Sequence, residues 1–172
     1  MADPALTTVF LDRDGVINAE ASSAEYIESW ASFEFLPGAV EAVARLRAAG
    51  LRVVVVTNQR GVSLGKMTAA DVEDIHTRMV AAGLEVDRIY YCPHGKGECD
   101  CRKPLPGMLE RAAREVPGVS LGRSAAIVGD SETDMEAGRT VGAVLVKVGE
   151  ATSPVDFECG SLAEAVDWLL AR

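Results

Sequence analysis

The chain has 172 residues, of which 48% are hydrophobic, and its formal net charge is −9 at pH 7. This length suits one domain with a substantial core, so we expect a single domain over residues 1–172. The acidic balance argues against a nucleic-acid partner, because nucleic-acid-binding surfaces are basic. No apolar run is long enough to span a bilayer and the N-terminus has no export signal, so we expect a cytoplasmic protein with no membrane partner.

Short apolar segments alternate along the chain with segments of helical periodicity. This alternation predicts an α/β fold with right-handed crossovers, that is, a doubly wound parallel sheet. The expected strands cover residues 7–11, 51–56, 88–91, 124–128 and 143–148. The expected helices cover residues 38–49, 68–82, 108–116, 135–140 and 161–170. No insertion is long enough for a separate cap domain, and the irregular residues 19–36 are expected to lie beside a functional site.

Polar groups follow the first four expected strands. They are Asp12 and Asp14, then Thr57-Asn58-Gln59, then Arg102-Lys103, and then Asp130. The carboxyl ends of parallel strands share one edge of the sheet, where ligands bind in open α/β folds, so we expect these groups to converge. Taken alone, the segment from Asp12 to Gly15 could simply form a turn.

This set of groups suits phosphoryl transfer. One carboxylate can attack phosphorus, and a second can protonate the leaving oxygen and later activate water. A carboxylate from another strand can help to hold Mg²⁺, which prefers oxygen ligands. A lysine and a hydroxyl group can hold the phosphoryl oxygens.

Three thiols and one imidazole fall within ten residues, at Cys92, His94, Cys99 and Cys101. This spacing predicts a closed tetrahedral zinc site with a structural role, and a disulfide bond is the alternative. Because Cys101 directly precedes Arg102-Lys103, the zinc-binding loop would decide where these two cations point. Cys159 is expected to be a small buried hydrophobic residue. His76 is expected to have a surface or packing role.

The four motifs resemble those of the haloacid dehalogenase (HAD) superfamily phosphatases, over about residues 7–148. They are Asp12-Arg13-Asp14-Gly15, Thr57-Asn58-Gln59, Arg102-Lys103-Pro104 and Gly129-Asp130-x-x-x-Asp134. More narrowly, the chain is similar to two related families of subfamily IIIA, the heptose-1,7-bisphosphate 7-phosphatases and the histidinol-phosphate phosphatases. The resemblance implies Mg²⁺-dependent hydrolysis of a phosphomonoester through an aspartyl-phosphate. A heptose bisphosphate is the favoured substrate, and histidinol phosphate or another small sugar phosphate is the alternative.

The resemblance also implies a role for each matching residue. Asp12 would be the nucleophile and Asp14 the general acid/base. Mg²⁺ would be bound by Asp12, the main-chain carbonyl of Asp14, and Asp130. Thr57 and Lys103 would hold the phosphoryl group, while Asp134 would orient its neighbours or simply be an acid at a helix N-terminus. Substrate contacts are expected from Arg13, Tyr26, Asn58, Gln59, Arg60, Arg102 and Ser131.

This chain departs from the heptose enzymes at two positions that bear on contacts with the second phosphate of the substrate. Those enzymes often have an arginine where this chain has Leu64, and commonly a lysine where it has Ser131. Arg60 could supply the charge that is missing at Leu64. A non-catalytic scaffold on a decayed phosphatase fold is the competing class, although every key group is present. We expect a monomer whose partner is a small phosphorylated sugar.

Overall fold

The computed structural model describes residues 4–22 and 25–172. Residues 1–3, which belong to the N-terminus searched for an export signal, and residues 23–24 of the expected irregular stretch lie outside the described part. Six strands form one sheet, in the order β3-β2-β1-β4-β5-β6. Every neighbouring pair is parallel. The strands are β1 (Thr8–Leu11), β2 (Arg52–Asn58), β3 (Arg88–Cys92), β4 (Ala125–Gly129), β5 (Val144–Val148) and β6 (Phe157–Cys159).

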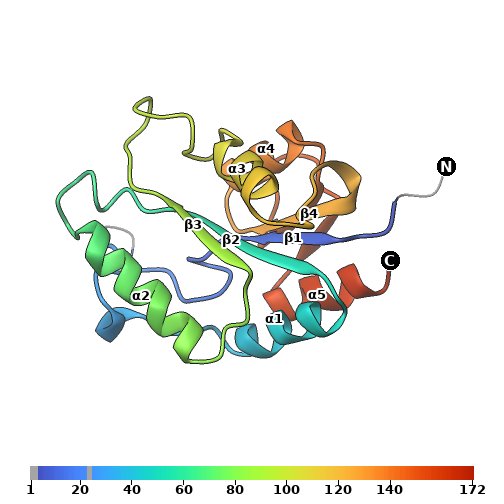
Figure 1. Cartoon of the computed structure of the whole chain (residues 1–172), viewed down its shortest axis with the longest axis horizontal. Coiled ribbons are helices and arrows are strands. Elements are labelled where there is room, and N and C mark those ends of the chain that lie inside the picture. The colour runs from blue at the N-terminus through green and yellow to red at the C-terminus, as the bar shows by residue number, and fades with distance from the viewer. Residues whose placement is uncertain (1–3, 23–24) are drawn as a thin grey trace.

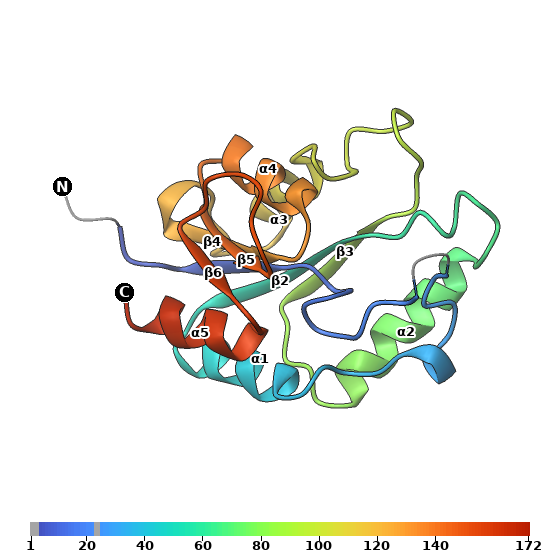
Figure 2. The same ribbon diagram turned by 180° about the vertical axis from the view of Figure 1, so that it is seen from behind.

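Helices cover both faces of this sheet (Figures 1 and 2). The α-helices are α1 (Ala39–Ala48), α2 (Ala69–Ala81), α3 (Gly107–Glu115), α4 (Glu132–Thr140) and α5 (Leu162–Leu170), with two short 3₁₀ helices, η1 (Trp30–Ser32) and η2 (Gly122–Ser124). Residues of α1, α2 and α5 share one hydrophobic cluster, and residues of α3 and α4 share the other. The fold is therefore doubly wound, which confirms the predicted fold class.

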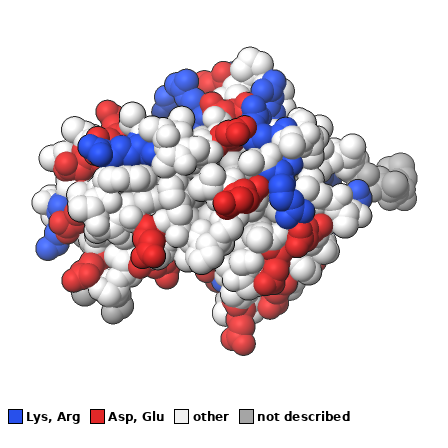
Figure 3. Space-filling view, turned by 90° about the horizontal axis from the view of Figure 1, so that it is seen from below, with Lys and Arg blue, Asp and Glu red and all other residues white. Residues whose placement is uncertain are grey.

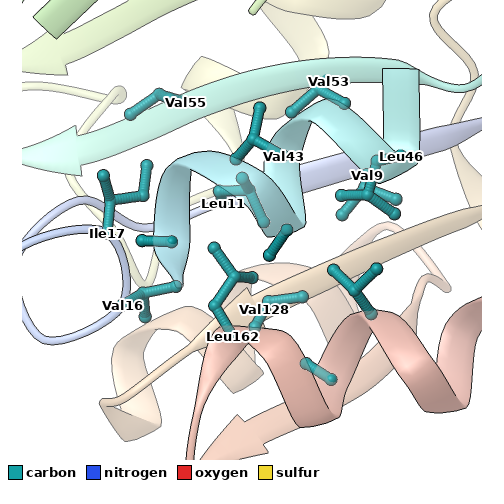
Figure 4. Packing of buried hydrophobic residues seen from close by; sticks show 14 of the residues in the cluster. Val9, Leu11, Val16, Ile17, Val43, Leu46, Val53, Val55, Val128 and Leu162 are labelled. Atoms are coloured by element: carbon teal, nitrogen blue, oxygen red, sulfur yellow. The ribbon is translucent and has the colours of Figure 1, made fainter. Parts of the chain in front are cut away.

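The strands are apolar on both sides because each side packs against helices. Val9 and Leu11 of β1 belong to the cluster beneath α1 and α5, whereas Phe10, between them, belongs to the cluster beneath α3 and α4. Figure 4 shows Val9 and Leu11 packed with Val43 of α1 and neighbouring side chains. Full burial of one such side chain stabilises the fold by roughly 1.5–3 kcal/mol. This packing holds the carboxyl end of β1 rigidly in the middle of the sheet.

Two details differ from the sequence-based expectations. The short strand β6 was not predicted, because Phe157–Cys159 has too few residues to show a period. Helix α4 begins at Glu132 instead of residue 135, since Ser131 and Asp134 form a capping box there. As expected from their place after Cys101, Arg102 and Lys103 lie in the long loop 93–106 between β3 and α3. In Figure 1 this loop extends beyond the end of β3 before the chain returns to α3.

The stretch between β1 and α1 is irregular, as expected, and is tied to the body of the domain. Asn18 bridges to both Asp14 and Phe35. The rings of Trp30 and Phe33 stack at 4.9 Å, and Phe35 packs edge-on against both rings. All three aromatic side chains pack against the cluster that contains α1 and α2. Among the described residues, no separate cap domain covers the sheet edge.

Two surface properties bear on the expected partners. No helix of the described residues is long and apolar enough to cross a membrane. On the face shown in Figure 3, acidic and basic side chains are interspersed, and this view of the described residues has no continuous basic surface.

Candidate active site

Asp12 lies at the carboxyl end of β1, where its carboxylate meets the ammonium group of Lys103. Lys103 Nζ lies 3.0 Å from Asp12 Oδ1, 2.5 Å from Asp134 Oδ1 and 2.7 Å from the carbonyl oxygen of Val56. The side chains of Lys103 and Asp134 are 2% and 0% exposed. Lys103 is therefore a buried cation with a full set of acceptors, not a solvated loop lysine.

Burial and neighbouring carboxylates raise the pKa values of Asp12 and Asp130. Burial, assisted by Asp134 and Asp14, raises the pKa of Asp12 to about 7. Burial, assisted by Asp12, raises the pKa of Asp130 to about 9. Burial alone would lower the pKa of Lys103, but Asp12 and Asp134 raise it instead. Such a group of buried acids is stabilised in its ionised form by a bound cation.

The carboxylate of Asp14 is held by several donors. Its Oδ1 accepts hydrogen bonds from Arg13 Nε at 3.1 Å and from Asn18 Nδ2 at 2.8 Å, and its Oδ2 accepts one from Gln59 Nε2 at 2.9 Å. Arg13 is 0% exposed. Arg13 was predicted to contact substrate; in this structure its guanidinium is buried and hydrogen-bonded to the Asp14 carboxylate, which it orients.

The two amides that follow β2 also act within the protein. Gln59 is buried, and its Nε2 donates to Thr57 Oγ1 at 2.9 Å as well as to Asp14. Asn58 Nδ2 donates to the carbonyl of Lys103 at 3.0 Å, and Asn58 Oδ1 accepts from the Lys103 amide at 3.1 Å. These contacts position Asp14, Thr57 and Lys103, and substrate contact by the two amide side chains stays a prediction.

A depression of about 160 Å³ opens above Asp12 and brings together most of the predicted site. Its lining residues are Asp12, Asp14, Glu20, Thr57, Asn58, Lys103, Asp130, Ser131 and Thr133. Glu20 was not predicted, because an acid in an irregular stretch carries no local signal of its orientation. Its carboxyl group makes a hydrogen bond to Asp130 that contributes to the raised pKa of Asp130.

A second, larger depression of about 410 Å³ adjoins the first and shares Lys103 and Thr133 with it. The charged residues of its lining are all basic: Lys96, Arg102 and Lys103. Arg102 Nη1 donates to the carbonyl of His94 at 3.2 Å, so the guanidinium is tied to the loop that holds the thiols.

The other predicted substrate contacts occupy different positions. Tyr26 lines a third depression of about 170 Å³ together with Asp14 and Gln59. Ser131 lines the depression above Asp12, and its Oγ donates to Asp134 Oδ2 at 2.7 Å. Arg60 is exposed and does not line these three depressions.

The thiols and the imidazole converge within the loop 93–106 and the end of β3. Cys92 Sγ lies 3.5 Å from both Cys99 Sγ and His94 Nδ1, and Cys101 Sγ lies 3.4 Å from the same two atoms. These separations are too long for a disulfide bond of about 2.05 Å. They approach the edge of about 3.8 Å expected for four ligands around Zn²⁺ at 2.3 Å. The donor set therefore fits a closed zinc site.

The acidic group fits a different ion. Oxygens of Asp12, Asp130 and Asp134 lie within 4.8 Å of one another. Asp134 is already engaged, because its Oδ1 accepts from Lys103 and its Oδ2 accepts from the amide and hydroxyl of Ser131. Asp12 and Asp130 are left to offer hard oxygen ligands of the kind that Mg²⁺ prefers.

Several known proteins are similar to this chain in sequence. The chain is 46% identical over 149 residues to the D-glycero-β-D-manno-heptose-1,7-bisphosphate 7-phosphatase of Pseudomonas putida, covering 83% of each chain. It is 41% identical over 159 residues to the corresponding enzyme for the α anomer in Mycobacterium bovis, covering 84% of this chain and 80% of the relative. With the β-anomer enzyme of Escherichia coli K12, identity is 38% over an alignment of 177 positions, gaps included, which covers 94% of this chain and 87% of the relative.

A solved structure shows the same fold. It is the D,D-heptose 1,7-bisphosphate phosphatase of B. bronchiseptica, complexed with magnesium and phosphate, with a TM-score of 0.85 and 34% identity over 96% of this chain and 99% of that one. Fold and site define a hydrolase with an acidic centre at the end of the first strand of a doubly wound sheet. The haloacid dehalogenase-like hydrolase family matches residues 6–142, and the chain belongs to this family.

Proposed function

We propose that the protein is a Mg²⁺-dependent phosphomonoester phosphatase. The observation that carries this proposal is the buried cluster in which Lys103 lies between Asp12 and Asp134, with Asp14 and Asp130 on the same depression. Asp12, Asp130 and the main-chain carbonyl of Asp14 would hold Mg²⁺. When bound, the ion would neutralise the acidic group and the phosphoryl oxygens.

The residues of the chain then divide the reaction between them. A carboxylate oxygen of Asp12 attacks phosphorus and forms an aspartyl-phosphate as the bond to the leaving oxygen breaks. The carboxyl group of Asp14 gives its proton to that oxygen, so that the product leaves as an alcohol. The Asp14 carboxylate then takes a proton from water, whose oxygen attacks phosphorus and frees Asp12. Lys103 and Thr57 stabilise the charge on the phosphoryl oxygens throughout.

The substrate proposed is D-glycero-D-manno-heptose 1,7-bisphosphate, hydrolysed at its 7-phosphate. The names of the relatives support it, and so does the basic depression beside the acidic one, which could receive the phosphate that is not transferred. The relatives divide between the α and β anomers, so both are candidate substrates.

None of the four cysteines would form a disulfide bond. Cys92, Cys99 and Cys101, together with His94, would hold one structural Zn²⁺. Free thiols are typical of reducing compartments, which supports a cytoplasmic location. The zinc would fix the chain segment that positions Arg102 and Lys103, because these two residues follow the ligand Cys101.

Phosphate release from both anomers of the bisphosphate, from heptose and hexose monophosphates and from histidinol phosphate tests the proposal. We expect the heptose bisphosphate to give the highest kcat/KM. Asp12→Asn should abolish turnover and leave the fold intact, because an amide cannot replace the nucleophile. Asp167→Asn, an exposed acid paired with Arg45, is the matched control and should retain full activity. Normal turnover by Asp12→Asn would exclude the mechanism, and a preference for histidinol phosphate would exclude the substrate.

A further inference from the structure

His76 and Arg13 are two buried polar residues to which the reaction above gives no direct part. His76 lies on α2 and is 8% exposed, and Arg13 is 0% exposed. Arg13 Nη1 lies 3.2 Å from His76 Nε2, while its Nε and Nη2 lie 3.1 Å and 3.0 Å from Asp14 Oδ1. The guanidinium thus connects an imidazole on α2 to the carboxylate proposed as the general acid/base.

The direction of the hydrogen bond between Arg13 and His76 follows from their chemistry. Arginine is always a donor, so Nε2 of the imidazole must be the unprotonated acceptor. Burial and the neighbouring charge of Arg13 lower the pKa of His76 to about 3, which keeps the ring neutral. Without an acceptor at this place, the buried Nη1 of Arg13 would have an unmet hydrogen bond, costing about 1–3 kcal/mol.

The ring of His76 is itself held in place. Tyr91 of β3 packs edge-on against it, with ring centroids 5.7 Å apart, and Tyr91 Oη donates to Glu73 Oε1 at 3.1 Å. Glu73 lies one turn before His76 on α2. The chain of contacts therefore runs from the packed helix through the imidazole and the guanidinium to the carboxylate.

We propose that His76 is a positioning residue, which fixes the guanidinium of Arg13 and thereby the carboxyl plane of Asp14; this role rests on the proposed phosphatase function. In the first step, the Asp14 carboxyl transfers its proton to the leaving oxygen as the phosphorus–oxygen bond breaks. An alkoxide needs this proton, whereas p-nitrophenolate is stable enough to leave without it. Misplacement of Asp14 should therefore slow hydrolysis of a sugar phosphate much more than that of p-nitrophenyl phosphate.

The experiment compares kcat/KM for these two esters in the wild type and in three variants. His76→Leu removes the acceptor, His76→Gln replaces it with an amide oxygen, and Ile75→Val reduces packing on the same helix without touching Arg13. We expect His76→Leu to lose roughly 10- to 100-fold on the sugar phosphate, part of the contribution of a general acid, and less than about 3-fold on p-nitrophenyl phosphate. His76→Gln and Ile75→Val should both keep the wild-type ratio of the two values.

Equal losses on both esters, or no recovery in His76→Gln, would show that His76 serves only the packing of α2 and would overturn the proposal. A readout independent of turnover is the hydrogen exchange of the Arg13 Nε–H, followed by NMR. It should be slow in the wild type and in His76→Gln and fast in His76→Leu. If the wild type hydrolyses neither ester in Mg²⁺, the proposed function fails, and the exchange measurement still decides whether His76 immobilises Arg13.

Discussion

The ammonium group of Lys103 lies 2.5 Å from Asp134 Oδ1 in a pair that is almost completely buried. Asp134 in turn is held at the N-terminus of α4 by Ser131, whose amide and hydroxyl both donate to Oδ2. Helix α4, which follows the β1 neighbour β4, thus helps to set the position of Lys103, the lysine proposed to hold the phosphoryl group. Asp134 is a structural anchor for the site as well as a helix-capping acid.

Removing Asp134 should destabilise the fold strongly. Asp134→Ala leaves Lys103 buried with one carboxylate fewer, and the loss of one partner from such a pair costs about 3–5 kcal/mol. Asp74→Asn breaks an exposed pair with Arg78 on α2 and should cost no more than about 0.5 kcal/mol. Chemical unfolding of both variants measures how much each substitution lowers the free energy of unfolding. If Asp134→Ala lowers the free energy of unfolding by less than about 1 kcal/mol, Asp12 alone is enough to compensate the buried charge of Lys103.

We expect that even the small change Gly15→Ala causes a large loss of activity. Its φ is +81°, and a Cβ there would lie 2.0 Å from Asp130 Oδ2, so the added methyl would displace a proposed Mg²⁺ ligand. Gly65→Ala is the control, because Gly65 has a similar φ of +68° but open space around the added carbon. We expect Gly65→Ala to lose about 1 kcal/mol of stability and no activity. Gly15→Ala should lose Mg²⁺-dependent turnover by more than about 100-fold. Similar activities in the two variants would exclude close approach of Asp130 to the turn.

The thiol loop should contain one tightly bound zinc per chain. Cys101→Ser removes one of four ligands and should lower both the zinc content and the melting temperature, since structural zinc contributes directly to folding. Cys159→Ser is the matched control, because this buried cysteine lies outside the cluster. Elemental analysis of protein purified without chelators gives the measurement. Wild-type protein without zinc would disprove the assignment.

Arg102 should govern the preference for a second phosphate. Arg102→Ala should lower kcat/KM roughly 10- to 100-fold for the bisphosphate, the loss expected for a charged hydrogen bond, and much less for the monophosphate. Arg60→Ala tests the other candidate; because Arg60 is exposed and outside the basic depression, we expect a smaller effect. Equal losses on both substrates in Arg102→Ala would mean that the guanidinium serves the transferred phosphate or the fold.

His76 should make the stability of the fold depend on pH. Burial, together with Arg13, lowers its pKa from 6.5 to about 3, so between these values the unfolded chain binds a proton that the folded chain excludes. The contribution of His76 to the free energy of unfolding therefore falls as the pH falls, by about 2 kcal/mol between pH 7 and pH 5. The His76→Gln variant has no imidazole to titrate at this position. Its free energy of unfolding, measured in urea, should therefore fall by about 2 kcal/mol less than that of the wild type between pH 7 and pH 5. Identical pH dependence in the two proteins would show that the folded imidazole is readily protonated.

Much of the protein could be predicted from local patterns. Alternating apolar and amphipathic segments indicated the doubly wound sheet, since burial on both faces leaves such a record in each strand. The acids after β1 and β4 were correctly expected to meet, because the ends of parallel strands share one edge. The spacing of the thiols and His94 was also enough to expect their convergence, because all four ligands lie within one short loop.

Only the tertiary structure decided which way individual side chains point. Arg13 and Gln59 belong to motifs that suggested substrate binding, yet the packing of α2 and the turn after β1 direct both toward Asp14. Glu20 and His76 carried no sequence signal, because their partners are Asp130 and Arg13, far away in the chain. A strand fixes the alternation of its side chains, whereas the path of the loop beyond it depends on contacts with distant segments. The sequence alone therefore determined which chemical groups gather at the sheet edge, and the fold determined which of them face a ligand and which hold the others in place.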